Sequence, residues 1–177
     1  MSKVRLATVW LDGCSGCHMS LLDMDERLIE VLRQADLVYG PLVDAKEYPK
    51  GVDIVLVEGA VSSEDDAHRI REIRQRTKIL VSLGDCAVTS NVPSMRNQFK
   101  LEEVERRAYV ENAQNNQHVP RKVIPKLLPH SRPVHEFVKV DVFVPGCPPE
   151  ADTIHFILTE LLAGRMPALA GKTHFGA

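Results

Sequence analysis

The chain has 177 residues, a formal net charge of −2, 44% hydrophobic residues and 26% charged residues, a balance that is ordinary for one folded domain with its own core. The near-neutral charge and the aromatic content of 5% argue against a nucleic-acid partner, which calls for a basic excess or stacking aromatics. No apolar run approaches the roughly 20 residues that span a bilayer. The first residues carry neither a cleavable apolar core nor paired arginines, so we expect a cytoplasmic chain without a membrane span.

Short apolar runs and helical spacing alternate along the chain. Strands are predicted at residues 4–10, 37–42, 52–57, 78–83 and 138–144. Helices are predicted from about Ser20 to Ala35, from Ser62 to Arg76 and from Glu150 to Leu162, with Gly164 as the stop of the last one. This alternation predicts an α/β fold. We expect residues 1–177 to form a single flavodoxin-like domain with a doubly wound, mostly parallel sheet and helices on both faces, ending in an irregular tail over residues 165–177.

Two polar segments stand out between these elements. The helix predicted from Ser62 begins with hydroxyl residues that can cap it and continues with acids that complement its dipole. Its arginines, at positions 69, 71, 74 and 76, are interpreted as a solvated helix face rather than a site for an anionic partner. Residues 112–133 show no periodicity and contain several prolines, which predicts a long irregular segment that is functional or held by a partner.

All the cysteines follow predicted strands. Cys14 and Cys17 come after the first strand, Cys86 after the fourth and Cys147 after the last. Because the carboxyl ends of parallel strands share one edge of a sheet, where such folds bind their ligands, we expect the four thiols to meet there. Thiols stay reduced in most cytosols, so metal binding or redox chemistry is the expected role.

The residues around these cysteines favour an iron–sulfur cluster. Gly13 and Gly16 let the backbone approach inorganic sulfide and turn amides toward it. The helix that begins near Cys17 is expected to favour the thiolate form. Prolines at positions 145, 148 and 149 stiffen the loop of Cys147.

Several alternatives remain open from the residues alone. A thioredoxin-like redox pair leaves two cysteines unexplained. A structural zinc site usually takes two close pairs, whereas Cys86 and Cys147 stand alone. Four cysteines can also hold a 2Fe–2S cluster. FMN binds at the same edge in flavodoxin-like domains, but here Cys14 and Cys17 occupy the loop that would cradle its phosphate.

In combination, these motifs resemble the small subunit of nickel–iron hydrogenases. The segments that carry the resemblance are Cys14-Ser15-Gly16-Cys17, Val57-Glu58-Gly59-Ala60, Gly84-Asp85-Cys86 and Pro145-Gly146-Cys147-Pro148-Pro149, within residues 4–163. The resemblance implies that Cys14, Cys17, Cys86 and Cys147 ligate one proximal 4Fe–4S cluster. It also implies that a separate large subunit carries the nickel–iron centre, so this chain holds no catalytic residue of its own.

The resemblance is nearest to the small subunit of soluble, bidirectional NAD-reducing hydrogenases. Membrane-bound and periplasmic relatives carry a twin-arginine leader and a C-terminal region for two further clusters, and this sequence shows neither. The implied partners are the large subunit and a diaphorase module with flavin, further iron–sulfur clusters and an NAD site. The implied reaction of the assembly is H2 + NAD+ ⇌ NADH + H+. The proximal-cluster subunit of respiratory complex I shares the Pro-Gly-Cys-Pro-Pro element, but it usually has adjacent cysteines at the first position, so the Cys14–Cys17 spacing favours a hydrogenase.

Two ionisable residues lie close to these motifs. His18 follows Cys17 and is interpreted as an ordinary loop histidine rather than a residue that tunes the site. Glu58 is expected either to form hydrogen bonds near the site or to cap a helix start.

Overall fold

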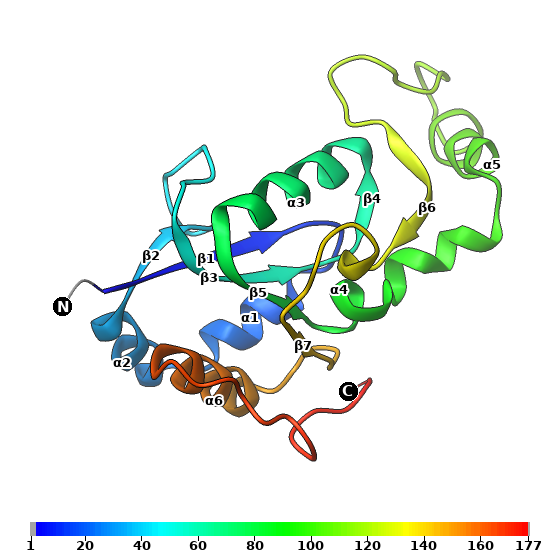
Figure 1. The fold of residues 1–177 in the computed structure, drawn as a ribbon. Helices are drawn as coiled ribbons and strands as arrows, with labels where there is room; N and C mark the ends of the chain where they lie inside the picture. Colours follow the sequence, from blue (N-terminus) through cyan, green and yellow to red (C-terminus); the bar gives the residue numbers. More distant parts are fainter. Residues whose placement is uncertain (1–2, 177) are drawn as a thin grey trace.

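A computed structural model describes residues 3–176 of the chain. Its centre is a five-stranded sheet in the order β2-β1-β3-β5-β7, with every neighbouring pair parallel (Figure 1). The strands are β1 (Val4–Trp10), β2 (Ala35–Tyr39), β3 (Val52–Glu58), β5 (Thr77–Leu83) and β7 (Val142–Val144). Counted within this sheet, the order is 2-1-3-4-5, which is the flavodoxin-like arrangement. The predicted fold class is confirmed.

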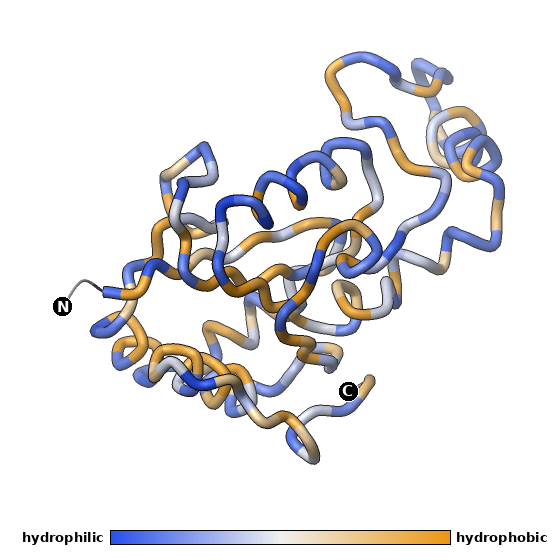
Figure 2. The backbone as a smooth tube through the Cα atoms, in the orientation of Figure 1, coloured by the Kyte–Doolittle hydropathy of each residue, from blue (hydrophilic) through white to orange (hydrophobic). Residues whose placement is uncertain are grey.

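Helices cover both faces of this sheet. Helices α1 (Gly16–Leu22), α2 (Glu26–Gln34) and α6 (Ala151–Leu162) pack on one face, whereas α3 (Glu64–Arg76) and α4 (Asp85–Thr89) pack on the other (Figure 1). Two separate clusters of buried apolar side chains fill the layers on either side of the sheet. Figure 2 shows hydrophobic residues along the central strands and hydrophilic residues over much of α3. None of the helices within residues 3–176 combines the length and apolar character needed to cross a bilayer.

The helix predicted from Ser20 to Ala35 is two helices. The chain breaks between α1 and α2, where Asp25 adopts a left-handed φ of 51°. Ala35, assigned to the helix from its spacing, instead opens β2 and pairs with Val4. The prediction of one helix was wrong because the apolar spacing continues across the break, whereas the backbone direction does not.

A second, two-stranded antiparallel sheet was not predicted. It joins β4 (Val61–Ser63) to β6 (Leu127–Arg132), so the end of the segment predicted as irregular, 112–133, is a strand. Between them the chain forms the 3₁₀ helix η1 (Val92–Gln98), helix α5 (Leu101–Arg106) and a π-helical turn η2 (Arg107–Glu111), and the short 3₁₀ helix η3 (Val134–Glu136) follows β6. Residues 101–126, called the arm below, project to one side of the main sheet (Figure 1).

Buried hydroxyl groups tie this second sheet to the main body. Ser62 in β4 donates to the Oγ of Ser131 in β6 at 2.7 Å, and the Oγ atoms of Ser131 and Ser90 lie 2.9 Å apart. Ser90 directly follows α4, so β6 is fixed to the helix that carries Cys86. Within the arm, the Nη1 and Nη2 atoms of Arg121 donate to the buried carboxylate of Glu105, at 2.8 and 2.7 Å.

The arginines of α3 are structural contacts rather than a free solvated face. Arg69 donates to the hydroxyl of Tyr39, and Arg76 donates to the carbonyl of Tyr48. Arg74 donates to the carbonyls of Thr77 and Lys78 and pairs with Asp141 just before β7. The interpretation as a solvated face was wrong for Arg69, Arg74 and Arg76, which these contacts hold in place, whereas Arg71 is exposed.

The capping expected at the start of α3 is confirmed, with Ser63 as the cap. Its Oγ accepts from the Asp66 N–H at 3.0 Å while the Asp66 carboxylate accepts from the Ser63 N–H at 3.0 Å. By contrast, the Oγ of Ser82 in β5 is buried and has no hydrogen-bond partner within the described part of the chain. One hydroxyl therefore satisfies a helix end, whereas the other is a buried polar group without compensation.

We expect Ser63→Ala to lower the free energy of unfolding by about 1 kcal/mol, because it removes one partner of the capping box. Ser82→Ala should leave the free energy of unfolding unchanged or raise it, because it removes an unpaired buried hydroxyl. Urea denaturation of the two variants beside the native chain, followed by circular dichroism, measures both changes. Equal losses in the two variants would contradict this account of Ser63.

A hydrogen-bonded carboxylate anchors β7 at the edge of the sheet. Burial opposes charge on Asp141, but the Leu80 N–H, at 2.8 Å, and Arg74 outweigh that effect and hold the pKa of Asp141 below its usual range. A carboxylate with a lowered pKa stabilises the folded state above its unfolded pKa, and this contribution is lost as the pH falls through the folded pKa.

We therefore expect Asp141→Asn to reduce stability at neutral pH and to approach the native stability as the pH falls below about 4. Denaturation midpoints measured across that pH range test the sign. Asp44→Asn is the matched control, since Asp44 is an exposed loop residue. A stability difference between Asp141→Asn and the native chain that stays constant with pH would refute the role given to Asp141.

Candidate metal centre

The cysteine loops leave the sheet from one row of paired residues. Trp10 at the end of β1 is in register with Glu58 of β3, Glu58 with Leu83 of β5, and Leu83 with Val144 of β7. Because all four strands are parallel, the loops that follow them emerge at the same edge. The predicted convergence of Cys14, Cys17, Cys86 and Cys147 follows from this row.

The first loop presents two thiols in different surroundings. Cys14 is exposed, whereas Cys17 lies in the first turn of α1 and is buried. The Gly16 N–H donates to the Cys14 Sγ at 3.4 Å, and a Cβ on Gly16 would lie 3.2 Å from that sulfur. Gly13 serves another purpose than expected, since an added Cβ would meet the Gly59 Cα at 3.2 Å.

Gly84 makes room for a thiol from a distant part of the chain. It caps the start of α4 with φ +81°, and a Cβ at this position would lie 2.2 Å from the Cys17 Sγ. Any side chain there meets both backbone strain and a direct clash with sulfur. This role of Gly84 was not predicted, because the contact joins segments far apart along the chain.

Of the other two thiols, Cys86 lies in the first turn of α4 and Cys147 lies in the loop between β7 and α6; both are partly buried. Cys86 receives a backbone N–H from Val92, and the side-chain amide of Asn91 donates to the Cys147 Sγ at 3.6 Å. Hydrogen bonds from N–H groups to sulfur stabilise negative charge on a thiolate ligand and help to set a cluster's potential. Asn91 and Val92 were not predicted as site residues.

The thiols act on one another electrostatically. Burial raises the pKa of Cys17, and the charges of Glu58, Cys86, Cys14 and Cys147 raise it further. Burial likewise raises the pKa of Cys86, and Cys147 and Cys14 add to it, against the hydrogen bond from Val92. The expectation that the Cys17 thiolate is favoured was wrong, because burial and neighbouring negative groups raise the pKa of this thiol.

This donor set suits an iron–sulfur cluster. Its thiols are deprotonated when they coordinate metal, and glycine faces the sulfurs of Cys14 and Cys17 where a side chain would intrude. A tetrahedral zinc site holds every sulfur about 2.3 Å from one ion. Within residues 3–176 no three His, Cys, Asp or Glu side chains are placed to hold a single metal ion.

A buried hydrogen-bonded contact between two side chains lies next to Cys17. His18 is in helix α1 rather than in a loop, and its Nδ1 contacts the Glu58 Oε2. The same oxygen accepts the His18 backbone N–H at 3.0 Å. Glu58 is thus a hydrogen-bonding residue near the site, whereas the interpretation of His18 as a loop histidine was wrong.

Hydrogen bonds to backbone carbonyl groups join the loops. The Gly84 N–H donates to the Val144 carbonyl at 2.8 Å, and the Asp85 N–H donates to the Gly146 carbonyl at 2.9 Å. The Ser20 hydroxyl of α1 donates to the Pro149 carbonyl at 2.5 Å. These bonds join the three loops that carry the cysteines, so the thiols are held by a connected framework.

The parallel sheet defines a flavodoxin-like domain, and the loops that carry its four free cysteines leave one edge of that sheet. The sequence is similar to proteins of one known family. The family profile described as NADH ubiquinone oxidoreductase, 20 Kd subunit, matches residues 14–161. The chain belongs to this family.

Its relatives are components of hydrogenases. The NAD-reducing hydrogenase HoxS subunit delta of Cupriavidus necator is 42% identical over 92% of this chain and 80% of its own length. A component of the F420-non-reducing hydrogenase vhu of Methanocaldococcus jannaschii is 40% identical over 96% of this chain, which spans 59% of that relative. A crystal structure of an NAD+-reducing NiFe hydrogenase in the H2-reduced state has a chain with a TM-score of 0.93 and 36% identity, covering 98% of this chain and 99% of that one. The resemblance to hydrogenase small subunits is confirmed.

We expect Gly84→Ala to prevent stable occupancy of the site, because its Cβ would displace the Cys17 sulfur. Gly51→Ala is the matched control: Gly51 also has a positive φ, +71°, but an added Cβ there meets nothing within 4 Å. Both variants place a side chain at a positive φ, which costs about 1 kcal/mol or more, and only Gly84→Ala adds a clash with sulfur. Iron content per chain after anaerobic purification is the measurement, and equal content in the two variants would contradict the prediction.

Proposed function

We propose that this chain is the electron-transfer small subunit of a soluble NAD-reducing nickel–iron hydrogenase, and that Cys14, Cys17, Cys86 and Cys147 hold one 4Fe–4S cluster. The observation that carries the proposal is the convergence of four thiols, from three loops, at the edge of a flavodoxin-like sheet. Among the relatives, the hydrogenase names support this reading over a subunit of respiratory complex I. FMN remains an untested alternative cofactor.

The chain's own residues would prepare this site for electron transfer. When bound, the cluster would supply one-electron transfer between a nickel–iron large subunit and a diaphorase with flavin and further clusters. The buried position of Cys17 keeps water away from part of the site. Amides of Gly16, Val92 and Asn91 lie against three of the sulfurs and would stabilise their negative charge without large movements. A site whose dipoles are already in place needs little reorganisation when its charge changes.

The exposed side of the site is suited to a protein partner. Cys14 is exposed, and Trp10 and Met19, on either side of its loop, leave 45% and 57% of their surface accessible. Large apolar side chains beside an exposed ligand are typical of a surface that a partner covers. We propose that the nickel–iron large subunit docks here. The assembly would then perform H2 + NAD+ ⇌ NADH + H+, and the cytoplasmic location stays a prediction.

Metal analysis of the anaerobically purified native complex tests the proposal. Iron, zinc and acid-labile sulfide are measured together with the EPR spectrum after reduction. About four irons and four sulfides assigned to this chain, with the signal of a reduced cluster, are expected for a 4Fe–4S site. Zinc without sulfide would reject the proposal, and about two irons with two sulfides would replace the cluster type.

The variant Cys147→Ser should lose electron flow from H2 to NAD+ by at least about two orders of magnitude, because a missing thiolate compromises the cluster. Ser82→Ala is the control, since it removes a buried hydroxyl from the sheet that supports the same loops. Hydrogen-dependent reduction of NAD+ by the complex is the assay. Full activity in Cys147→Ser would show that this thiol is not a required ligand.

A further inference from the structure

The buried carboxylate of Asp85 is hydrogen-bonded to the loop that carries Cys147. Asp85 is only 5% exposed, and its Oδ1 accepts the Gly146 N–H at 2.7 Å. Its other oxygen, Oδ2, accepts the Gly176 N–H at 2.8 Å. The Asp85 N–H in turn donates to the Gly146 carbonyl. Asp85 therefore connects the loop of Cys86, the loop of Cys147 and the tail of the chain.

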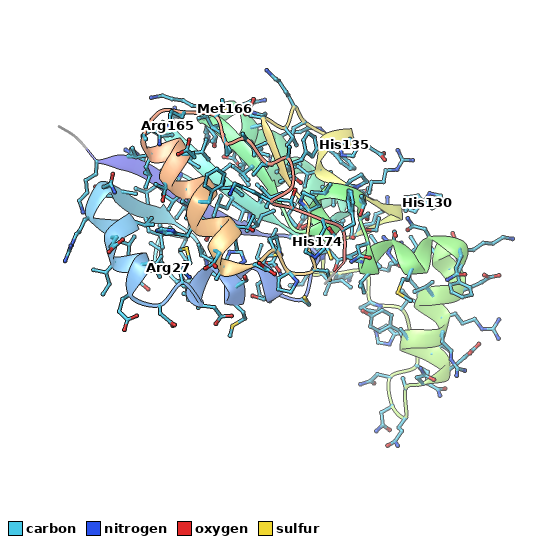
Figure 3. The ribbon with its side chains drawn as sticks, turned by 90° about the horizontal axis from the view of Figure 1, so that it is seen from below. Arg27, His130, His135, Arg165, Met166 and His174 are labelled. Carbon is cyan, nitrogen blue, oxygen red and sulfur yellow. The ribbon has the colours of Figure 1, made fainter. Side chains whose placement is uncertain are left out.

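The tail of the chain returns to this loop. After α6 it turns back along the helix, so that Arg165 and Met166 lie near one end of α6 and His174 lies near the other (Figure 3). The Thr153 hydroxyl donates to the Lys172 carbonyl at 3.1 Å, and the Lys172 Nζ lies 4.4 Å from the centroid of the Phe156 ring. These contacts fix the tail on the surface of α6.

Gly176, in the tail, forms a backbone hydrogen bond with Cys147, one of the candidate ligands. The Gly176 carbonyl accepts the Cys147 N–H at 2.9 Å, while the Gly176 N–H donates to Asp85. One residue of the tail thus satisfies both the backbone of a candidate ligand and the carboxylate beside another candidate ligand, Cys86. Within residues 165–176 the chain has no helix or strand, so these bonds and the contacts with α6 hold it in place.

We propose that Asp85 and Gly176 form a clasp that positions the Cys147 ligand loop and protects the site from loss of its metal. Asp85 is the positioning residue of the clasp, and a shortened chain can test the contribution of the tail. This inference rests on the proposed function. It gives a role to Asp85 and to the tail, neither of which is among the proposed metal ligands.

The chemistry of the clasp calls for a carboxylate at position 85. Both of its oxygens accept backbone N–H groups, and a charged acceptor makes such bonds stronger than a neutral one does. An asparagine has one acceptor oxygen, so its NH2 group would face either the Gly146 N–H or the Gly176 N–H. Asp85→Asn therefore removes one bond of the clasp and its negative charge while it keeps the size of the side chain.

The test measures how fast iron leaves the anaerobically purified complex when a strong ferrous chelator is added. Three forms are compared with the native complex: Asp85→Asn, a chain that stops after Thr173 and so lacks Gly176, and Asp44→Asn as an exposed control. We expect iron release to be about tenfold faster or more in the first two, the size of effect that the loss of a charge-assisted hydrogen bond produces. Asp44→Asn should release iron at the native rate.

Measurement of the reduction potential distinguishes the effect of the negative charge of Asp85 from the effect of the hydrogen bonds of the clasp. Asp85→Asn should shift the potential of the EPR signal to more positive values, because a negative charge near the site is removed. The shortened chain keeps Asp85, so it should release iron faster with a smaller shift of potential. A purely structural role of Asp85 at the start of α4 would give faster iron release without a shift of potential in either variant, and that result would overturn the positioning role.

The failure of this inference differs from the failure of the proposed function. If the native complex contains no iron and sulfide in this subunit, both are wrong. If it contains them and both variants release iron at the native rate, only the clasp is wrong. Should Asp85→Asn fail to assemble, the shortened chain decides, because it keeps every strand and helix of the fold.

Discussion

The register of the parallel sheet is the constraint on which the rest of this structure depends. Trp10, Glu58, Leu83 and Val144 form one row across four strands. A slip of one residue in any strand would reverse the faces of its side chains and carry the following loop away from its neighbours. The central strand β3 guards against such a slip, because it is buried on both sides and six of its seven residues are fully buried. The register of the strands therefore fixes the position at which each loop begins, even though the loops themselves are irregular.

Negative groups crowd together at this edge. The carboxylates of Glu58 and Asp85 are buried, and the thiols of Cys17 and Cys86 resist ionisation because of burial and of one another. A set of free anions here is unfavourable, and under the proposed function metal ions would neutralise it, so that metal uptake would release protons. The hydrogen bond from His18 to Glu58 and those from backbone N–H groups to Asp85 offset part of this repulsion in advance.

Local signals made part of this structure predictable. The first strand and the end of α3 lie where short-range patterns placed them, and the meeting of the cysteines followed from a general rule of parallel sheets. The pairing of β4 with β6 and the space that Gly84 leaves for Cys17 depend on residues far apart in sequence, and no local pattern encodes them. The assignment of Cys14, Cys17, Cys86 and Cys147 as ligands stays a prediction, because geometry alone does not identify the bound group.

The Ser20–Pro149 hydrogen bond joins the first helix to the loop after the last strand, across 129 residues of sequence. A domain emerges from the ribosome with its N-terminal segment first. The pair Cys14 and Cys17 is therefore synthesised early and must wait for β7 to dock at the far edge of the sheet before its remaining partner arrives. If the proposed function is right, a nascent chain that stops before Cys147 would offer an incomplete set of ligands, and the cofactor would bind only after β7 has docked.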